Sequence, residues 1–175
     1  MKQKKQQKSS GPKVRVTPMS LLKTTQAPLS IGKASKRDVR TQFAAICYRV
    51  RKDETQILLV TSRGTGRWIL PKGWPMDGLT PAAAAAQEAW EEAGVIGKLK
   101  NVCIGIYSSI KVLDDGEEAP CVVAVFPIRV KSLSDDFPEA GQRKRKWFSA
   151  KKAASLVLEP ELKHLLRKFD HRLMG

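Results

Sequence analysis

The chain has 175 residues, which suits one compact domain with an extension and is too short for two full domains. Its formal net charge is +15, and this charge is uneven: residues 1–40 hold 11 of the 32 Lys and Arg residues but only one of the 17 acidic residues, a balance of +10 against +5 for the rest. Residues 1–40 also lack an apolar stretch long enough for a membrane span or a secretory signal, so we expect a soluble, cytoplasmic protein without a transmembrane segment.

The first 40 residues are rich in Lys, Gln, Ser and Pro and poor in aromatic residues. This composition is typical of a flexible extension, so we predict a basic arm over 1–40 and a folded domain over 41–175. Two functions of the arm stay open. It attracts polyanions such as RNA or acidic lipids, or it is a solvated extension without a partner.

The folded part alternates β-rich runs with helical patterns. RKDET reads as a hairpin connection between the first two strands, and LDDGEEAP as a turn between two later ones. The predicted strands are 41–50, 56–62, 67–70, 98–112, 121–130 and 146–149. The predicted helices are 81–93, 150–157 and 159–174. This order predicts an α/β class with a mixed sheet and helices around it, as in an α/β/α or α+β sandwich.

Three cysteines lie in apolar, strand-like runs: Cys47, Cys103 and Cys121. Their number is odd and no C-x-x-C spacing is present. We therefore expect three buried free thiols in a reducing compartment, and no zinc site.

The helix over 81–93 has well-marked ends. Thr80 is a suitable N-cap, Pro81 suits the first turn, and Gly94 suits the residue just past the end. Its five consecutive alanines favour a rigid helix that can approach a sheet closely, and Ala82, Ala86, Ala89 and Ala93 share one side.

Three carboxylates crowd the other side of this helix. At about 100° per residue, Glu88, Glu91 and Glu92 fall on one side of one turn, and the helix itself holds no Lys or Arg to relieve their repulsion. A divalent cation would relieve it, since carboxylate oxygens are the ligands that Mg²⁺ prefers. The alternative is an ordinary solvated acidic face.

The stretch from Gly73 to Val95 resembles the Nudix box. The matching positions are Gly73, Glu88, Ala89, Glu91, Glu92, Gly94 and Val95, and LPKG leads into them. Two positions depart, since Leu79 stands where the family has a glutamate and Gln87 where it has an arginine. An acidic and a basic position are thus lost together, and Gln87 can still donate a hydrogen bond to a neighbouring glutamate.

A second resemblance, over about 41–169, is to the diphosphoinositol polyphosphate phosphohydrolases within this family. It is carried by SRGTGRWILPKG, EEAGVIGKLK and RKRKWFSAKKAASLV. It implies contacts to a densely charged substrate from six basic residues. These are Arg63, Arg67, Lys72, Arg143, Lys144 and Arg145.

The resemblance implies a Nudix-type α/β/α sandwich that hydrolyses phosphoanhydrides with Mg²⁺ or Mn²⁺. Glu88, Glu91 and Glu92 would be the catalytic and metal-binding carboxylates, helped by the backbone carbonyl of Gly73. Glu88 is our first choice for the general base. Glu117 or Glu118, in the turn over 113–120, is a competing source of a carboxylate unless that turn is simply a solvated tip.

The implied substrates are nucleoside diphosphates linked to another group, diadenosine polyphosphates and diphosphoinositol polyphosphates. An alternative is an RNA-associated module that acts on or binds RNA 5′ ends through the basic arm. The natural substrate and the oligomeric state stay open, since the box supplies the metal chemistry and the surrounding loops set selectivity.

Overall fold

A computed structural model describes residues 39–174, so nearly all of the predicted basic arm lies outside the described residues. The strands are β1 (Arg40–Arg51), β2 (Glu54–Thr61), β3 (Trp68–Ile69), β4 (Lys72–Gly73), β5 (Val95–Leu99), β6 (Gly105–Val112), β7 (Glu118–Leu133) and β8 (Arg145–Ser149). The helices are α1 (Pro81–Ala93), α2 (Ala150–Leu156) and α3 (Pro160–Lys168), followed by a 3₁₀ turn, η1 (His171–Met174).

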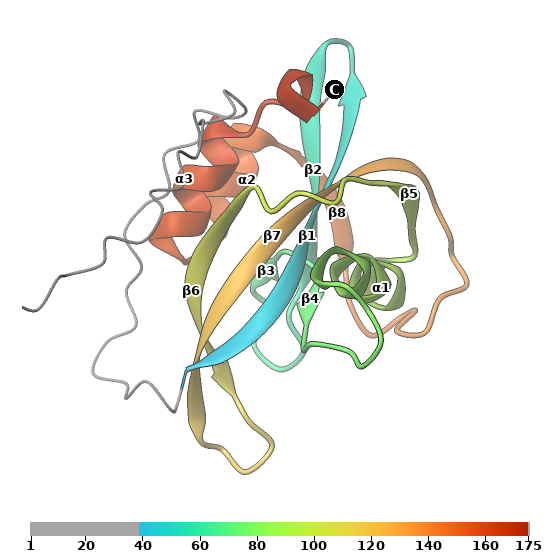
Figure 1. The fold of residues 1–175 in the computed structure, drawn as a ribbon. Helices are drawn as coiled ribbons and strands as arrows, with labels where there is room; N and C mark the ends of the chain where they lie inside the picture. Colours follow the sequence, from blue (N-terminus) through green and yellow to red (C-terminus); the bar gives the residue numbers. More distant parts are fainter. Residues whose placement is uncertain (1–38, 175) are drawn as a thin grey trace, which may run out of the picture.

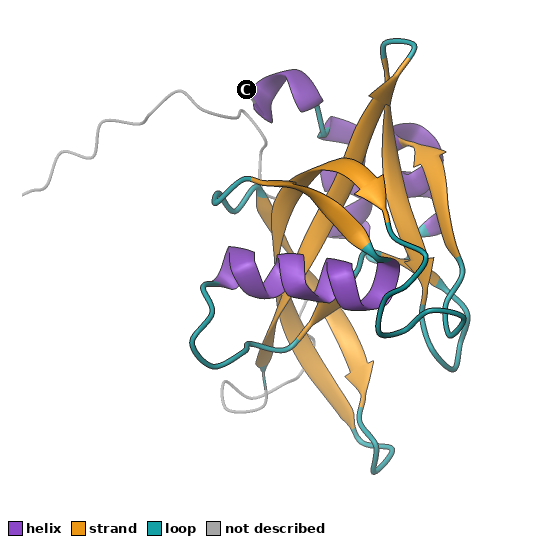
Figure 2. Ribbon diagram, turned by 90° about the vertical axis from the view of Figure 1, so that its right-hand side faces the viewer, coloured by secondary structure: helices purple, strands orange, loops and turns teal. Residues whose placement is uncertain are grey.

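One mixed sheet separates two layers of helix (Figure 1). Helix α1 covers one face, and α2 and α3 cover the other, as the perpendicular view in Figure 2 also shows. The α/β/α sandwich expected from the sequence is therefore confirmed. In the part of the chain that the structure describes, no helix is both long and apolar enough to cross a membrane.

The centre of the sheet is a parallel pair, β1 and β7, in the strand order β3-β2-β1-β7-β5. Both faces of β1 are buried, and its residues alternate between two cores. Ala44, Ile46 and Tyr48 face the α2 and α3 side, whereas Ala45 and Cys47 face α1. Burial on both faces explains why this strand reads as a nearly continuous apolar run.

Helix α1 has the ends that the sequence predicts. The Thr80 hydroxyl accepts a hydrogen bond from the backbone N–H of Ala83 at 3.2 Å, and Gly94 closes the helix with a φ of 64°. The buried face differs from the prediction, since Ala84 and Ala85 are fully buried whereas Ala86 is only half-buried. Small side chains on this face let the helix lie close to the sheet.

Both predicted hairpins form. β1 and β2 are joined by Lys52 and Asp53, whose φ values of 49° and 61° fit a two-residue turn that matches the twist of the strands. β6 and β7 pair antiparallel, and their connection turns at Gly116 with a φ of 85°.

The prediction of one strand over 98–112 is wrong. The structure has two strands there, β5 and β6, separated by 100–104, and both pair with β7. β7 has 16 residues, long enough to hold both partners along one edge. Cys103 lies in the separating segment and is exposed, so the expectation of three buried thiols holds only for Cys47 and Cys121.

The helix predicted over 159–174 is also interrupted. α3 ends at Lys168, and Phe169 has extended backbone with φ −65° and ψ 120°. Asp170 then caps η1 by accepting a hydrogen bond from the backbone N–H of Arg172 at 2.9 Å. A local side-chain cap thus competes with continuation of the helix.

The close approach of α1 to the sheet leads to a stability prediction. Ala89→Leu should lower the free energy of unfolding by about 1–3 kcal/mol, because Ala89 is fully buried and a larger side chain overpacks the interface. Ala83→Leu, on a half-buried position of the same helix, is the matched control and should cost less. Urea denaturation of both variants checks this; equal losses would contradict it.

Candidate active site

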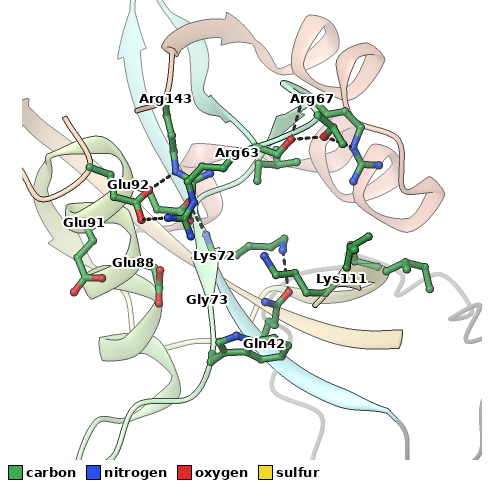
Figure 3. Close-up of a pocket in the computed structure, with 18 of the residues that line it drawn as sticks. Gln42, Arg63, Arg67, Lys72, Gly73, Glu88, Glu91, Glu92, Lys111 and Arg143 are labelled. Atoms are coloured by element: carbon green, nitrogen blue, oxygen red, sulfur yellow. Dashed lines mark hydrogen bonds and ion pairs between the residues drawn. The ribbon is translucent and has the colours of Figure 1, made fainter. Parts of the chain in front are cut away.

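A cavity of about 350 Å³ lies between α1, β4, β6, the loop that joins β2 to β3, and the loop that precedes β8 (Figure 3). Helix α1 contributes Glu88, Glu91 and Glu92 to one wall. Cationic side chains line much of the opposite wall, so that negative and positive groups face each other across one space. The carboxylates that the sequence placed on one side of the helix therefore share one cavity.

Gly73 is needed for space. The carboxyl group of Glu88 lies directly against its Cα, and a Cβ at this position would overlap with that carboxyl. Gly73 does not have a positive φ, so its freedom of backbone conformation is not what the site uses. Within the described residues the half-buried Glu88 carboxyl has no hydrogen-bond or ion-pair partner.

Glu92 is the most constrained of the three carboxylates. It is only 5% exposed, and its Oε1 lies 2.7 Å from Nη2 of Arg143. Its Oε2 accepts a hydrogen bond from the backbone N–H of Lys72 at 3.2 Å. Arg143 also donates to the carboxylate of Glu139 and to the backbone carbonyl of Thr61. This buried pair ties α1 to β4 and to the loop before β8.

Glu91 has a neutral partner. Gln87 donates a hydrogen bond from Nε2 to Oε1 of Glu91 at 2.7 Å, as expected for the glutamine at a departing box position. The other departing position, Leu79, is 44% exposed in the loop before α1. Neither departure leaves a buried charge without a partner.

Burial and mutual repulsion change the ionisation of two of these carboxyls. Burial first, and then the negative charge of Glu91 and Glu139, raises the pKa of Glu88 from 4.5 to about 6. Burial also raises the pKa of Glu92 from 4.5 to about 7, although Arg143 opposes this shift. Ionisation of these two carboxyls is therefore costly in the metal-free cavity, and a cation bound beside them would lower this cost.

The opposite wall is cationic. Lys72 donates from Nζ to Oε1 of the buried Gln42 at 2.9 Å, and burial lowers the pKa of its amine. Lys111, on β6, extends toward the same space (Figure 3).

Arg67 donates to the hydroxyl of Thr65 at 3.2 Å, and the largely exposed Arg63 lies 3.9 Å from Glu139. The sequence analysis did not identify Lys111 as a site residue. The one feature that could have indicated it is its position between two apolar residues, Ile110 and Val112, near the end of a strand.

The six basic residues predicted to contact substrate are not all brought together. Arg63, Arg67, Lys72 and Arg143 line the cavity, whereas Lys144 and Arg145 do not. Lys144 is exposed. Arg145 donates to the backbone carbonyls of Ala93 and Ser134 and to Asp135, which places its guanidinium at the C-terminal end of α1.

Carboxylates from outside α1 also reach the cavity. They are Glu139, from the loop before β8, and Glu159, just before α3, which accepts a hydrogen bond from the hydroxyl of Ser109 at 3.2 Å. Glu117 and Glu118 do not line it. The sequence offered no local signal that Glu159 rather than Glu117 or Glu118 would line the cavity, because only the packing of α3 brings Glu159 to β6.

The donor chemistry fits a divalent cation. Among the described residues the Glu88 carboxyl has no hydrogen-bond or ion-pair partner and that of Glu91 has one neutral partner, and both line the cavity beside Gly73 of β4. As they stand, however, the described His, Cys, Asp and Glu side chains do not converge in any group of three that could hold a metal ion. Binding a cation therefore requires the glutamate side chains to turn toward one point.

The raised pKa values predict how stability depends on pH in metal-free buffer. A folded-state pKa above the unfolded value makes ionisation costly to the fold, so this cost is absent below about pH 4.5 and complete above about pH 6 for Glu88. Glu88→Gln should therefore raise the melting temperature at pH 8 and leave it nearly unchanged at pH 4. Glu118→Gln, on the exposed hairpin, serves as the control, and thermal scans in EDTA at both pH values decide the matter.

The position of Arg145 predicts a role in stability. Arg145→Ala should lower the free energy of unfolding by about 1–3 kcal/mol, because two backbone carbonyls lose a charged donor. Lys144→Ala removes the adjacent exposed cation and should change stability little. Chemical denaturation compares the two, and a similar small effect of both changes would contradict this assignment.

Comparison with known proteins places this geometry in a family. The NUDIX domain matches residues 40–169. The chain is 30% identical over 120 residues to Nudix hydrolase 12, mitochondrial, of Arabidopsis thaliana, across 67% of this chain and 59% of that protein. It is also 30% identical over 120 residues to diphosphoinositol polyphosphate phosphohydrolase 3-alpha of Mus musculus, across 67% of this chain and 69% of that protein. The chain thus spans about three fifths of the length of the Arabidopsis relative.

Solved structures agree on the fold. A binary complex of the C. elegans Ap4A hydrolase matches with a TM-score of 0.56 and 22% identity, over 78% of this chain and 98% of that one. This likeness concerns the fold alone. Since the NUDIX match covers most of the chain, from the start of β1 to the end of α3, the chain belongs to the Nudix family.

Proposed function

We propose that this Nudix protein hydrolyses a phosphoanhydride with the help of Mg²⁺ or Mn²⁺. The substrate classes that we consider are a nucleoside diphosphate linked to another group, a diadenosine polyphosphate and a diphosphoinositol polyphosphate. The observation that carries the proposal is the single cavity in which the carboxylates of α1 face Lys72, Lys111 and Arg67. The names of the related hydrolases support it.

The residues that would hold the cation are Glu88, Glu91 and Glu92, with the backbone carbonyl of Gly73. When bound, a divalent ion neutralises charge on the phosphate oxygens and makes a nearby water more acidic. Hydrogen bonds from Arg143 and from the backbone N–H of Lys72 hold the Glu92 carboxylate in place, so Glu92 would determine where the cation binds. We therefore assign Arg143 the task of holding Glu92.

Glu88 is the carboxylate that we propose as the general base. It is half-buried, has no partner among the described residues, and its pKa is raised to about 6. A base with a pKa near the working pH combines a useful ionised fraction with enough basicity to accept a proton from water. The space left by Gly73 keeps its carboxyl against the floor of the cavity.

The cations of the opposite wall would bind the phosphates. Lys72 is held by Gln42 and points its amine into the cavity, where Lys111 adds a second point charge. Arg63 and Arg67 stand at the loop between β2 and β3 and can bind phosphate oxygens in pairs. Together these residues would orient the anhydride with its bridging oxygen near the carboxylates.

A substrate screen tests the proposal. The protein is incubated with members of the three substrate classes, with and without Mg²⁺ or Mn²⁺, and released phosphate or nucleotide is measured. We expect metal-dependent turnover that falls by about 10²–10⁴-fold in Glu88→Gln, because the base is lost while the shape of the side chain is kept. Glu88 is preferable to Glu92 here, because Glu92→Gln would leave the buried Arg143 with one partner fewer.

Glu54→Gln is the matched control, since this exposed glutamate at the start of β2 lies outside the cavity and should leave turnover unchanged. Absence of hydrolysis across the whole panel with either metal would overturn the proposed function. Full activity of Glu88→Gln would instead overturn the role given to this residue.

A further inference from the structure

A second groove continues from the candidate active-site cavity along the outer side of β6. Five residues line both spaces, so the two form one continuous surface: Arg67, Ser109, Ile110, Val112 and Glu159. The groove has a volume of about 410 Å³, which is within the range of sites that hold small ligands. A ligand anchored in the cavity can therefore extend into it.

This groove carries an unusual apolar surface. Val112, Leu158 and Ile110 are 58%, 55% and 51% exposed, and they are the three most exposed large apolar side chains in the described part of the chain. Ile110 and Val112 are two positions apart on β6 and so leave the strand on the same side, while Leu158 comes from the segment between α2 and α3. Apolar side chains gathered beside a polar cavity are typical of a binding surface.

The charge of the groove differs from that of the cavity. Arg67 is its only cation among the described lining residues, and Glu118 and Glu159 supply two carboxylates. Ser108 and Ser109 add hydroxyl groups, although both donate to carboxylates of the α3 region. A group that carried further phosphates would face these carboxylates, and like charges would oppose its binding.

An uncharged ring with N–H or O–H donors fits such a surface. Its faces can cover Ile110, Val112 and Leu158, and its donors can reach the carboxylates at the rim. A nucleoside has these properties, and its 5′ oxygen links it to a phosphate chain. An inositol ring that bears a phosphate on nearly every carbon does not have them.

We propose that the groove over Ile110, Val112 and Leu158 binds the nucleoside end of the substrate while its polyphosphate lies in the cavity. The proposal rests on the proposed function and selects among its substrate classes. The enzyme prefers nucleoside polyphosphates to diphosphoinositol polyphosphates, because the apolar side chains of the second groove bind an uncharged ring and its carboxylates repel a phosphorylated one.

Binding measurements test this inference without turnover. The test variant is Ile110→Ser with Leu158→Ser. The matched control is Ile96→Ser with Leu173→Ser, which removes the same two residue types from positions 46% and 50% exposed elsewhere on the molecule. Isothermal titration in Mg²⁺ uses two ligands with methylene bridges, an ATP analogue in which methylene groups replace both the α,β- and the β,γ-bridging oxygens, and a bismethylene triphosphate that has no nucleoside.

We expect the Kd of the ATP analogue to rise about tenfold in the test variant and to stay unchanged in the control, because only the first loses apolar contact with the base. The Kd of the triphosphate should not change in either variant. An unchanged Kd for the ATP analogue, or an equal change for both ligands, would overturn the inference. Faster hydrolysis of diphosphoinositol than of diadenosine polyphosphates by the wild type would also overturn it.

The two proposals fail in different ways. If the protein hydrolyses phosphoanhydrides but the Kd of the ATP analogue does not change when Ile110 and Leu158 are replaced, the groove assignment alone is wrong. If nucleotide binding depends on these residues but no anhydride is hydrolysed with either metal, the groove assignment stands as a binding site and the proposed function is wrong.

Discussion

The mutual repulsion of three carboxylates on one turn of α1 determines which partners the rest of the site must supply. The helix contains no cation of its own, and the compensation comes instead from Arg143, far along the chain, which pairs with Glu92 in a buried position. Such a pair contributes little net stability, but losing one partner is costly. Its effect is to fix one carboxylate firmly, whereas in the described part of the chain the Glu88 carboxyl has no partner and that of Glu91 accepts a hydrogen bond only from Gln87.

The sequence predicts the parts of this site whose causes are local. The caps at Thr80 and Gly94, the glutamates of α1 and the glycine ahead of them all act within one stretch, so spacing alone reveals them. The partners of that stretch cannot be found in this way. Arg143 and Lys111 reach the cavity because strands that are distant in the chain pair with each other, and a pattern over neighbouring residues does not predict that pairing.

The same limit explains the errors in the fold. The run over 98–112 is apolar enough to suggest one strand, yet β7 binds it as two pieces with the exposed Cys103 between them. Local propensity cannot show where a long partner strand changes neighbours. Nor does it show that the glutamates of α1 and the cations Lys72 and Lys111 lie across one cavity from each other.

The parallel pairing of β1 with β7 has a consequence for how the protein is made. Residues 40–48 lie against 121–129, so the middle of the sheet cannot close until the ribosome has released most of the domain. Until then the apolar strand around Ile46 can pair only along the edge that β2 and β4 occupy, and its other edge is open to foreign chains. Pairing over so long a loop is also slow. During its synthesis this domain therefore passes through a stage in which the unpaired edge of β1 is exposed to aggregation.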